Sequence, residues 1–272
     1  MAKLYMLESV RDTINTSFII EDKGTLIVID GGYPEESDIL YPYLKKLGGV
    51  VKAWFLTHAH DDHISAIFTV LNKYDDIKVE KVYYTFPSDE FLHAAEPKQK
   101  YMTMLDMVHT LRETVENHGA DTVDVKEGDV YEFGGIKVRV LLTYDESVTA
   151  NPINNSSSVF RFEINGKSIM FLGDLGVEGG ERLIAKNSHE MLKADYVQMA
   201  HHGQDGVGKE VYEVARPRFC LWCTPSWLWD NKGPEGYDTG NYKTIIVRGW
   251  ISELHCAEKH YVMKDGTHVI DL

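Results

Sequence analysis

Three histidines and two aspartates occur within residues 57–63, which read THAHDDH and directly follow the apolar run 53–56. Neutral imidazole nitrogens and carboxylate oxygens are the ligands that Zn²⁺ and similar divalent ions take in proteins. A metal with an open coordination position lowers the pKa of a bound water from about 15.7 to about 7, and the metal-bound hydroxide can attack a phosphorus or carbonyl centre. The segment therefore predicts metal-assisted hydrolysis.

The elements around this run must direct its side chains toward a metal. Residues 51–56 are predicted to form a buried strand and the residues from 61 onward a helix, so the ligands lie on a strand-to-helix turn. His58 and His60 then face one metal position. Asp62 and His63, in the first helical turn, face a second position, and paired metals in hydrolytic sites lie about 3.5–4 Å apart.

Two later apolar runs also end in residues that can bind metals. Residues 169–174 read IMFLGD, a predicted buried strand that ends in Asp174. Residues 196–203 read YVQMAHHG, a second such strand that ends in a His-His-Gly turn.

The motif HxHxDH at residues 58–63, followed by Leu-Gly-Asp and His-His-Gly, resembles the signature of the metallo-β-lactamase superfamily. The resemblance implies an α+β fold, the αββα sandwich, in which two packed mixed β-sheets are flanked by helices and metals bind along one edge. It also implies that Asp174 bridges two metals, and that His201 completes the second site with Asp62 and His63.

One histidine of many family members is missing here. No histidine occurs between His118 and His189, and residues 151–160 read NPINNSSSVF. This run, with the other motifs, resembles a narrower branch that also substitutes the histidine, the hydrolase domain of ComEC/Rec2-type DNA-uptake proteins and their stand-alone relatives. An oxygen of Asn155 or Ser157 could replace it, which would favour Mn²⁺ or Mg²⁺, and a plain turn is the alternative.

We therefore expect two divalent metal ions, Zn or Mn, with the possibility that only one is tightly bound. Asp62 and Asp174 are the predicted catalytic residues, because Asp62, or a second bound water, could pass a proton to the leaving group while Asp174 bridges the metals. The predicted metal ligands are His58, His60, Asp62, His63, Asp174 and His201, with Asn155 as a further candidate.

The composition limits the partners. The 272 residues include 28 Lys and Arg against 42 Asp and Glu, a net charge of −14, which weighs against an extended nucleic-acid surface. A small or oligomeric anionic substrate held by the metals is compatible with this charge. No apolar run approaches the roughly 20 residues that span a bilayer, and the first residues lack a signal-peptide pattern, so a cytoplasmic protein without membrane contact is expected.

Cysteine usage agrees with a reducing compartment, because the number of cysteines is three, which is odd. Cys220 and Cys223 form a CxxC motif within a predicted strand. Side chains alternate between the faces of a strand, so the two sulfurs are expected on opposite faces as buried structural residues.

The remaining pattern shows no repeat or linker, so one domain over residues 1–272 is predicted. Asp30, at the end of a predicted strand, lies near the metals by the same resemblance, or else belongs to a plain turn.

A loop rich in aromatic residues, which could line a pocket or pack against the sandwich, is predicted for residues 225–242. A hairpin is predicted for the last two strands. Strands are predicted at 3–7, 17–21, 25–30, 130–133, 136–142, 159–164, 168–172, 218–223, 260–264 and 267–271, and helices at 37–47, 62–74, about 102–118 and 207–215.

Phosphodiester hydrolysis, on a nucleotide or oligonucleotide-like substrate, is the favoured function. Two alternatives stay open. The same hydroxide could hydrolyse a carboxylic ester, lactone or thioester, or the loss of one histidine could leave a non-catalytic metal-binding module.

Overall fold

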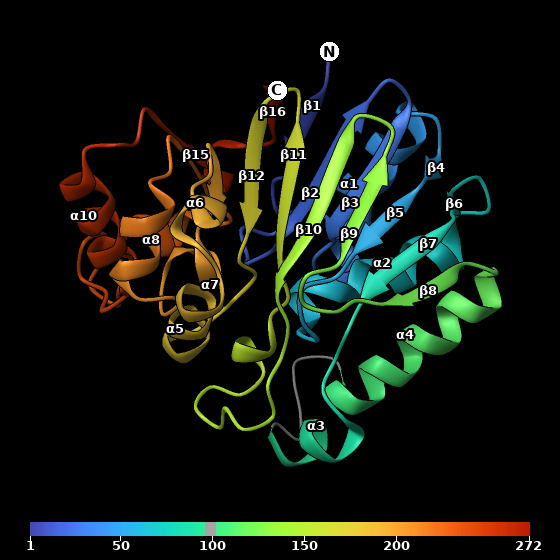
Figure 1. Cartoon of the computed structure of the whole chain (residues 1–272), viewed down its shortest axis with the longest axis horizontal. Helices are drawn as coiled ribbons and strands as arrows, with labels where there is room; N and C mark the ends of the chain where they lie inside the picture. Colours follow the sequence, from blue (N-terminus) through green and yellow to red (C-terminus); the bar gives the residue numbers. More distant parts are fainter. Residues whose placement is uncertain (96–101) are drawn as a thin grey trace.

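The computed structural model describes residues 1–95 and 102–272, and in this part of the chain two seven-stranded β-sheets pack face to face (Figure 1). Helices cover both outer faces, so the predicted αββα sandwich is confirmed. The first sheet contains, in spatial order, β16 (His268–Asp271), β1 (Lys3–Met6), β2 (Ser17–Asp22), β3 (Thr25–Asp30), β5 (Ala53–Phe55), β7 (Lys81–Tyr84) and β8 (Asp121–Asp124). The second contains β15 (Lys259–Val262), β14 (Phe219–Trp222), β13 (Tyr196–Gln198), β12 (Lys167–Phe171), β11 (Val159–Ile164), β10 (Ile136–Leu142) and β9 (Val130–Phe133).

The helices divide between the two outer faces. Those of the N-terminal half are α1 (Ser37–Lys46), α2 (Asp61–Lys73), α3 (Asp89–Ala95) and α4 (Met104–His118). Those of the C-terminal half are α5 (Val177–Lys186), α6 (His189–Leu192), α7 (Ala200–Gly203), α8 (Lys209–Ala215), α9 (Ser226–Trp229) and α10 (Thr244–Leu254). Shorter elements are β4 (Val50–Val51), which pairs with β6 (Lys78–Val79), and the 3-10 turns η1 (Pro34–Glu36), η2 (Asn154–Ser156) and η3 (Met263–Asp265).

Local signals explain where the main helices begin and end. The Thr103 side chain accepts a hydrogen bond from Asp106 N and caps the start of α4, and Gly119 in a left-handed conformation (φ 75°) ends it. Helix α2 begins at Asp61, with two carboxylates in its first turn, where they face the positive end of the helix dipole.

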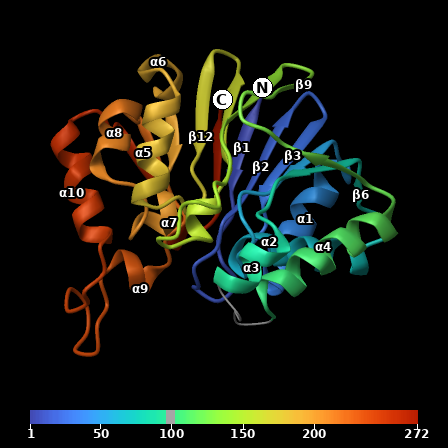
Figure 2. The same cartoon turned by 60° about the horizontal axis from the view of Figure 1, so that its bottom comes forward.

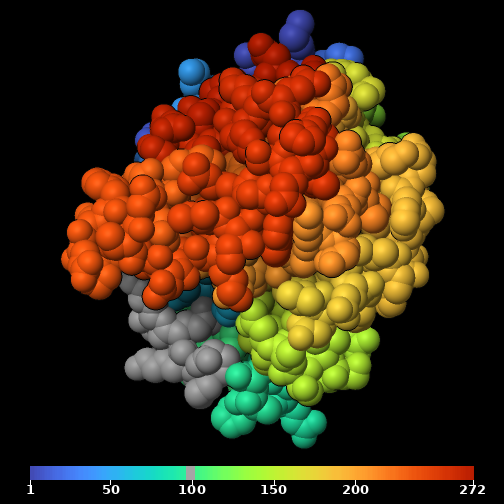
Figure 3. Space-filling model, turned by 90° about the vertical axis from the view of Figure 1, so that its left-hand side faces the viewer, coloured from blue at the N-terminus to red at the C-terminus, as the bar shows by residue number. Residues whose placement is uncertain are grey.

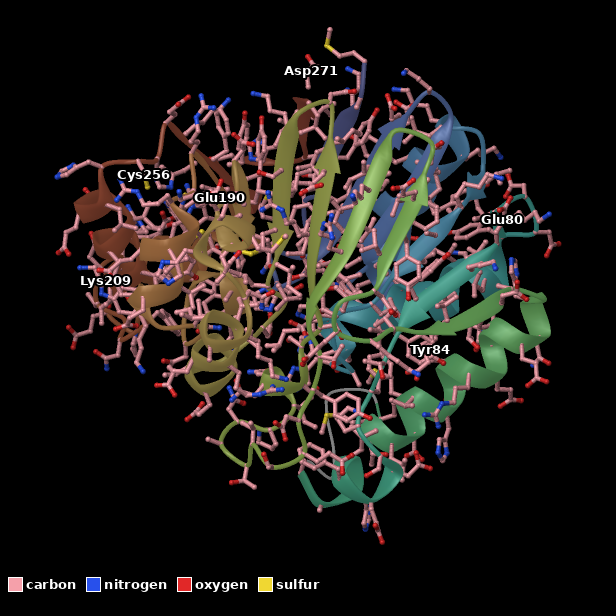
Figure 4. The ribbon with its side chains drawn as sticks, in the orientation of Figure 1. Glu80, Tyr84, Glu190, Lys209, Cys256 and Asp271 are labelled. Carbon is pink, nitrogen blue, oxygen red and sulfur yellow. The ribbon has the colours of Figure 1, made fainter. Side chains whose placement is uncertain are left out.

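Alternation along the strands builds the core in layers. Tyr83 faces the second sheet, whereas its neighbour Tyr84, labelled in Figure 4, packs on the side of α4. Cys220 in β14 and Cys223 directly after it likewise face opposite sides of the second sheet, as predicted, and burial raises the pKa of the Cys220 thiol to about 12. Both cysteines are therefore buried structural residues.

Parallel strands bring the functional turns to one edge. Strands β3, β5 and β7 run parallel in the first sheet, as do β12, β13, β14 and β15 in the second. The segments that follow β5, β12 and β13 contain residues 58–63, Asp174 and the His-His pair. Figure 2 turns this edge, the lower one in Figure 1, toward the viewer.

The predicted final hairpin is wrong. Strand β15 pairs in parallel with β14 in the second sheet, whereas β16 pairs antiparallel with β1 in the first. Residues 263–266 carry the chain between the sheets, and Gly266 makes the bend with φ 96°. A turn signal between two strands indicates a change of direction but not the strand with which each one pairs.

Helix α10 is an element that the sequence patterns did not predict, and the loop before it contains the short helix α9. Trp229 packs edge to face on Trp222, with ring centroids 5.2 Å apart, and the guanidinium of Arg248 in α10 lies 4.1 Å from the Trp229 ring centroid. These aromatic rings therefore pack on the sandwich. Figure 3 shows the C-terminal segment, orange to red, covering most of this face.

Among the residues that the structure describes, no helix combines the length and the apolar character that a membrane crossing requires.

Phe55 offers a test of the packing between the sheets. Its ring lies 4.6 Å from that of Tyr83, 5.1 Å from Phe160 and 5.4 Å from Phe162, between centroids. We expect Phe55→Ala to lower the free energy of unfolding by about 3–5 kcal/mol in urea titration. Tyr237→Ala, whose parent side chain is 67% exposed, should change it by less than about 0.5 kcal/mol. Equal effects of the two variants would contradict this packing.

Candidate metal centre

The first group of candidate ligands lies deep in the edge between the sheets. Asp62, His63, Asp174 and His202 place one ligand atom each within 4.8 Å of one another, and all four residues are buried. His202 Nε2 lies 2.9 Å from Asp62 Oδ2 and 3.4 Å from Asp174 Oδ2. His63 Nε2 lies 3.1 Å from Asp174 Oδ1. Two nitrogens and two carboxylates thus surround one position.

A second group shares the same aspartate. His58, His60 and Asp174 also place their ligand atoms within 4.8 Å of one another. His58 Nε2 lies 2.9 Å from His60 Nδ1 and 3.9 Å from Asp174 Oδ2. Asp174 therefore lies between two neighbouring groups of nitrogen donors, the arrangement of a carboxylate that bridges two metals.

The unsatisfied atoms of these groups fit a cation. Within residues 1–95 and 102–272, His63 Nε2, His202 Nε2 and Asp174 Oδ1 are buried and lie close to opposite charge, but none of these contacts has hydrogen-bond geometry. A buried polar atom without a partner costs about 1–3 kcal/mol. A divalent ion would accept a lone pair from each of these atoms, so the donor set fits a divalent metal ion.

The electrostatics of the first group, which contains Asp62, also favour a bound cation. Burial lowers the pKa of His63, but three nearby carboxylates, Asp174 foremost, outweigh burial and raise it well above its usual value. Burial also lowers the pKa of His202, yet Asp174 and Asp62 raise it to about 9. The position between these rings therefore attracts positive charge, which a metal ion supplies in place of protons.

In the second group, the surroundings of His58 and His60 favour the neutral form of both imidazole rings. Burial, followed by positive charge on neighbouring histidines, holds the pKa of His58 well below its usual range. Burial likewise lowers the pKa of His60. Neutral imidazole is the form that donates a lone pair to a metal.

Hydrogen bonds behind the rings fix their orientation. His63 Nδ1 donates to Asp30 Oδ2 at 2.8 Å, and the same carboxylate accepts from Thr57 N and Thr57 Oγ1, both at 2.8 Å. His202 Nδ1 donates to the carbonyl oxygen of Cys223 at 3.2 Å. Each bond leaves Nε2 directed at the candidate position, as is usual for metal-bound histidines. Asp30 thus contacts the cluster from behind, through His63.

The His-His pair differs from the sequence-based expectation. That expectation assigned His201 to the group of Asp62 and His63, whereas the structure brings His202 there. His201 Nε2 lies 3.8 Å from Asp174 Oδ2. Both residues have left-handed backbones, at φ 51° and 55°, so strand alternation gives no guide to the direction of either ring. The sequence pattern did not place His202 beside Asp62 for this reason.

The side chain of Asn155, the further candidate ligand, makes four hydrogen bonds to the backbone and to Glu178. Its Oδ1 accepts hydrogen bonds from Gly176 N at 3.0 Å and Gly179 N at 2.9 Å. Its Nδ2 donates to Ala150 O at 2.7 Å and Glu178 Oε2 at 3.1 Å. The amide therefore satisfies the backbone at the start of α5, which is a capping role.

Ser157, the alternative oxygen donor, instead holds the turn that contains Asp174. Its Oγ accepts a hydrogen bond from Asp174 N at 3.1 Å. Gly173 precedes this aspartate at φ 57°, and a Cβ there would lie 2.8 Å from Ser157 Oγ and 3.0 Å from Thr57 Cβ. Only glycine fits between the segments that contain Ser157 and Thr57, so this close approach sets the position of the Asp174 carboxylate.

Comparison with known proteins places the chain among sequences of one family. Residues 10–205 match the family model described as the metallo-beta-lactamase superfamily. ComE operon protein 3 of Bacillus subtilis (strain 168) is 28% identical over 188 residues, which cover 67% of this chain and 21% of that protein. The chain thus spans about a fifth of the length of this curated relative.

Solved structures of the same fold extend over the whole chain. The metallo-beta-lactamase fold protein YhfI from Bacillus subtilis has a TM-score of 0.58 at 11% identity, with all of both chains covered. Igni18, described as a novel metallo hydrolase from the archaeon Ignicoccus hospitalis, has a TM-score of 0.56 at 14% identity, also with all of both chains covered. At these identities the likeness establishes the fold.

Replacement of Asn155 separates capping from metal binding. We expect Asn155→Ala to reduce the free energy of unfolding by about 1–3 kcal/mol, because two backbone N–H groups lose their acceptor. The folded variant should keep its metal content, measured by plasma emission spectroscopy. Loss of metal at unchanged stability would instead make Asn155 a ligand.

Replacement of Asp30 tests the support behind His63. Asp30→Asn keeps the size of the side chain but removes the charge that the His63 N–H faces, so we expect metal affinity to fall by about 10–100-fold in chelator competition. Asp22→Asn is the matched control, because Asp22 is a buried aspartate at the far end of the same hairpin. A similar loss in both variants would argue against a specific role for Asp30.

Proposed function

The chain belongs to the metallo-β-lactamase superfamily, and we propose that it is a metal-dependent hydrolase of phosphodiesters, nucleotide or oligonucleotide-like in kind. The observation that carries the proposal is the position of Asp174, whose carboxylate contributes to both candidate ligand groups. Zn²⁺ and Mn²⁺ are the proposed ions.

The proposed ligands follow the two groups. His58, His60 and Asp174 would hold the first ion, and Asp62, His63, Asp174 and His202 the second, with His202 in the place first expected for His201. Bound there, the cations would lower the pKa of a bound water and offset negative charge that develops on the phosphoryl group.

Asp62 is the proposed proton carrier for this reaction. Burial raises the pKa of its carboxyl group, but the neighbouring rings of His63 and His202 outweigh burial and lower it. The group is therefore ionised near neutral pH and can accept a proton beside the reacting water and release it to the leaving oxygen.

The substrate class rests on two considerations. The resemblance to DNA-uptake proteins, together with the match to ComE operon protein 3, supports a phosphodiester. The net charge of −14 supports a small or short anionic substrate that is bound chiefly by metal ions, rather than a long duplex that is bound by a basic surface.

The test is hydrolysis of bis-p-nitrophenyl phosphate by metal-free protein, with and without added Mn²⁺ or Zn²⁺. We expect turnover that depends on metal, is removed by a chelator, and falls by about a hundredfold or more in Asp174→Asn, which loses the shared charge. Asp121→Asn, a change of an exposed aspartate on β8, is the control.

Parallel assays with p-nitrophenyl acetate, a lactone and a thioester distinguish the alternatives. Metal-dependent turnover of these acyl compounds without turnover of the phosphodiester would move the assignment to acyl hydrolysis. Bound metal with no turnover of any substrate would indicate a non-catalytic metal-binding module, and absence of bound metal would overturn the proposal.

A further inference from the structure

We infer that His201 supplies the nitrogen ligand that the first metal position lacks, so that the adjacent histidines of α7 serve one metal each. The inference rests on the proposed function in one respect, since it requires that both positions bind a cation. It assigns the missing ligand to a segment after Asp174, although the sequence pattern suggested a segment before it.

Without such a residue the first position has two nitrogen donors and no third ligand of its own. His58 and His60 contribute two nitrogens, and Asp174 contributes an oxygen that it shares. Catalytic zinc sites take three protein ligands in addition to water, and here the third is a carboxylate that a second ion would share. Asn155 Oδ1 already accepts two backbone N–H groups, which use both of its lone pairs, and Ser157 Oγ accepts one from Asp174 N.

The backbone of the His-His pair is in a costly conformation. His201 has φ 51° and ψ 52°, and His202 has φ 55° and ψ 22°. A non-glycine residue in this region costs about 1–2 kcal/mol. Two such residues in succession are retained where the surroundings hold them, and such strain is concentrated at functional sites.

Specific contacts hold this conformation. His201 N donates to Gly173 O at 3.0 Å, in the turn that contains Asp174. Thr224 Oγ1 donates to His202 O at 2.6 Å. Gly203 follows at φ 80°, and a Cβ there would lie 2.4 Å from the ring of Trp222. The His-His pair is therefore held against the ends of β12 and β14, with each ring near the Asp174 carboxylate.

The two rings are oriented in the same way. His201 Nδ1 donates to the carbonyl oxygen of Asp205 at 3.0 Å, just as His202 Nδ1 donates to a backbone carbonyl. In both rings Nε2 then carries the lone pair. His201 Nε2 lies 3.8 Å from Asp174 Oδ2, the same oxygen that lies 3.9 Å from His58 Nε2.

These distances are close to those of metal ligands. Two ligands at about 2.0–2.1 Å from a tetrahedral ion lie about 3.3 Å apart, so the contact between His201 and Asp174 must shorten by roughly half an ångström. His201 lies outside the group of His58, His60 and Asp174, whose ligand atoms are all within 4.8 Å of one another, so its ring must also move toward these two histidines. The His201 side chain can make this shift more easily than the others, because it is 21% exposed whereas those of His58 and His202 are fully buried.

Asn154 provides an independent indication of a ligand at this place. Its Nδ2 donates a hydrogen bond of 3.4 Å to His201 Nε2, which a bound ion would have to replace, and the residue is only 4% exposed. Within the described part of the chain, its Oδ1 is buried without a hydrogen-bond partner. A polar oxygen left unsatisfied beside a ring nitrogen indicates a polar occupant, such as water on a bound ion.

Metal counting in paired variants tests the assignment. Wild type, His201→Gln and His202→Gln are loaded with Co²⁺, dialysed, and measured for metal per chain and for the visible absorption of the bound cobalt. We expect the ratio to fall from two in wild type to one in each single variant, with different spectra for the remaining ion.

Double variants show which position each histidine serves. His58→Gln with His201→Gln should still bind one ion, because both changes affect the first position. His58→Gln with His202→Gln should bind none. His255→Gln is the matched control, since His255 is an exposed histidine with φ 50° at the end of α10, and it should bind two ions.

The outcomes separate this inference from the proposed function. Two ions at unchanged affinity in His201→Gln would overturn the inference and leave the proposed function intact. The same conclusion would follow if the double variant of His58 and His202 bound one ion while the double variant of His58 and His201 bound none. Fewer than two ions in wild type would overturn the binuclear proposal itself. His201→Asn, which tolerates the left-handed backbone better, repeats the test if the glutamine variant does not fold.

Discussion

The burial of the Asp174 carboxylate is the constraint on which the rest of the structure depends. The residue is 1% exposed, and a buried charge is tolerated only where nearby groups compensate it. Burial alone would raise the pKa of Asp174, but His202 and His63 hold it well below its usual range. Because His63 follows the first sheet and His202 the second, this compensation joins the two halves of the sandwich at one edge.

The fold and most of the centre could be predicted because their signals are local. An apolar run followed at once by THAHDDH specifies a strand end, a turn and a helix start within residues 53–63. The helix begins at Asp61, so Asp62 and His63 lie in its first turn as expected. The same reasoning placed Asp174 directly after a buried strand.

The remaining features depend on contacts that are distant in sequence. Whether His201 or His202 faces Asp62 is decided by two left-handed residues, and Thr224 and the Trp222 ring help to hold that turn. Asn155 caps a helix that begins more than 20 residues later. The last two strands pair in different sheets. Periodicity and turn signals describe neighbours along the chain, so they do not contain this information.

The position of β16 has a consequence for the order of folding. Lys3 of β1 pairs with Asp271 of β16. The strand that covers the outer edge of β1 is therefore synthesised 260 or more residues after β1 itself. While the protein is synthesised, the backbone edge of β1 stays unpaired and can pair with another nascent chain. The sheet whose strand β5 leads to His58 and His60 thus gains its outermost strand only when residues 268–271 leave the ribosome.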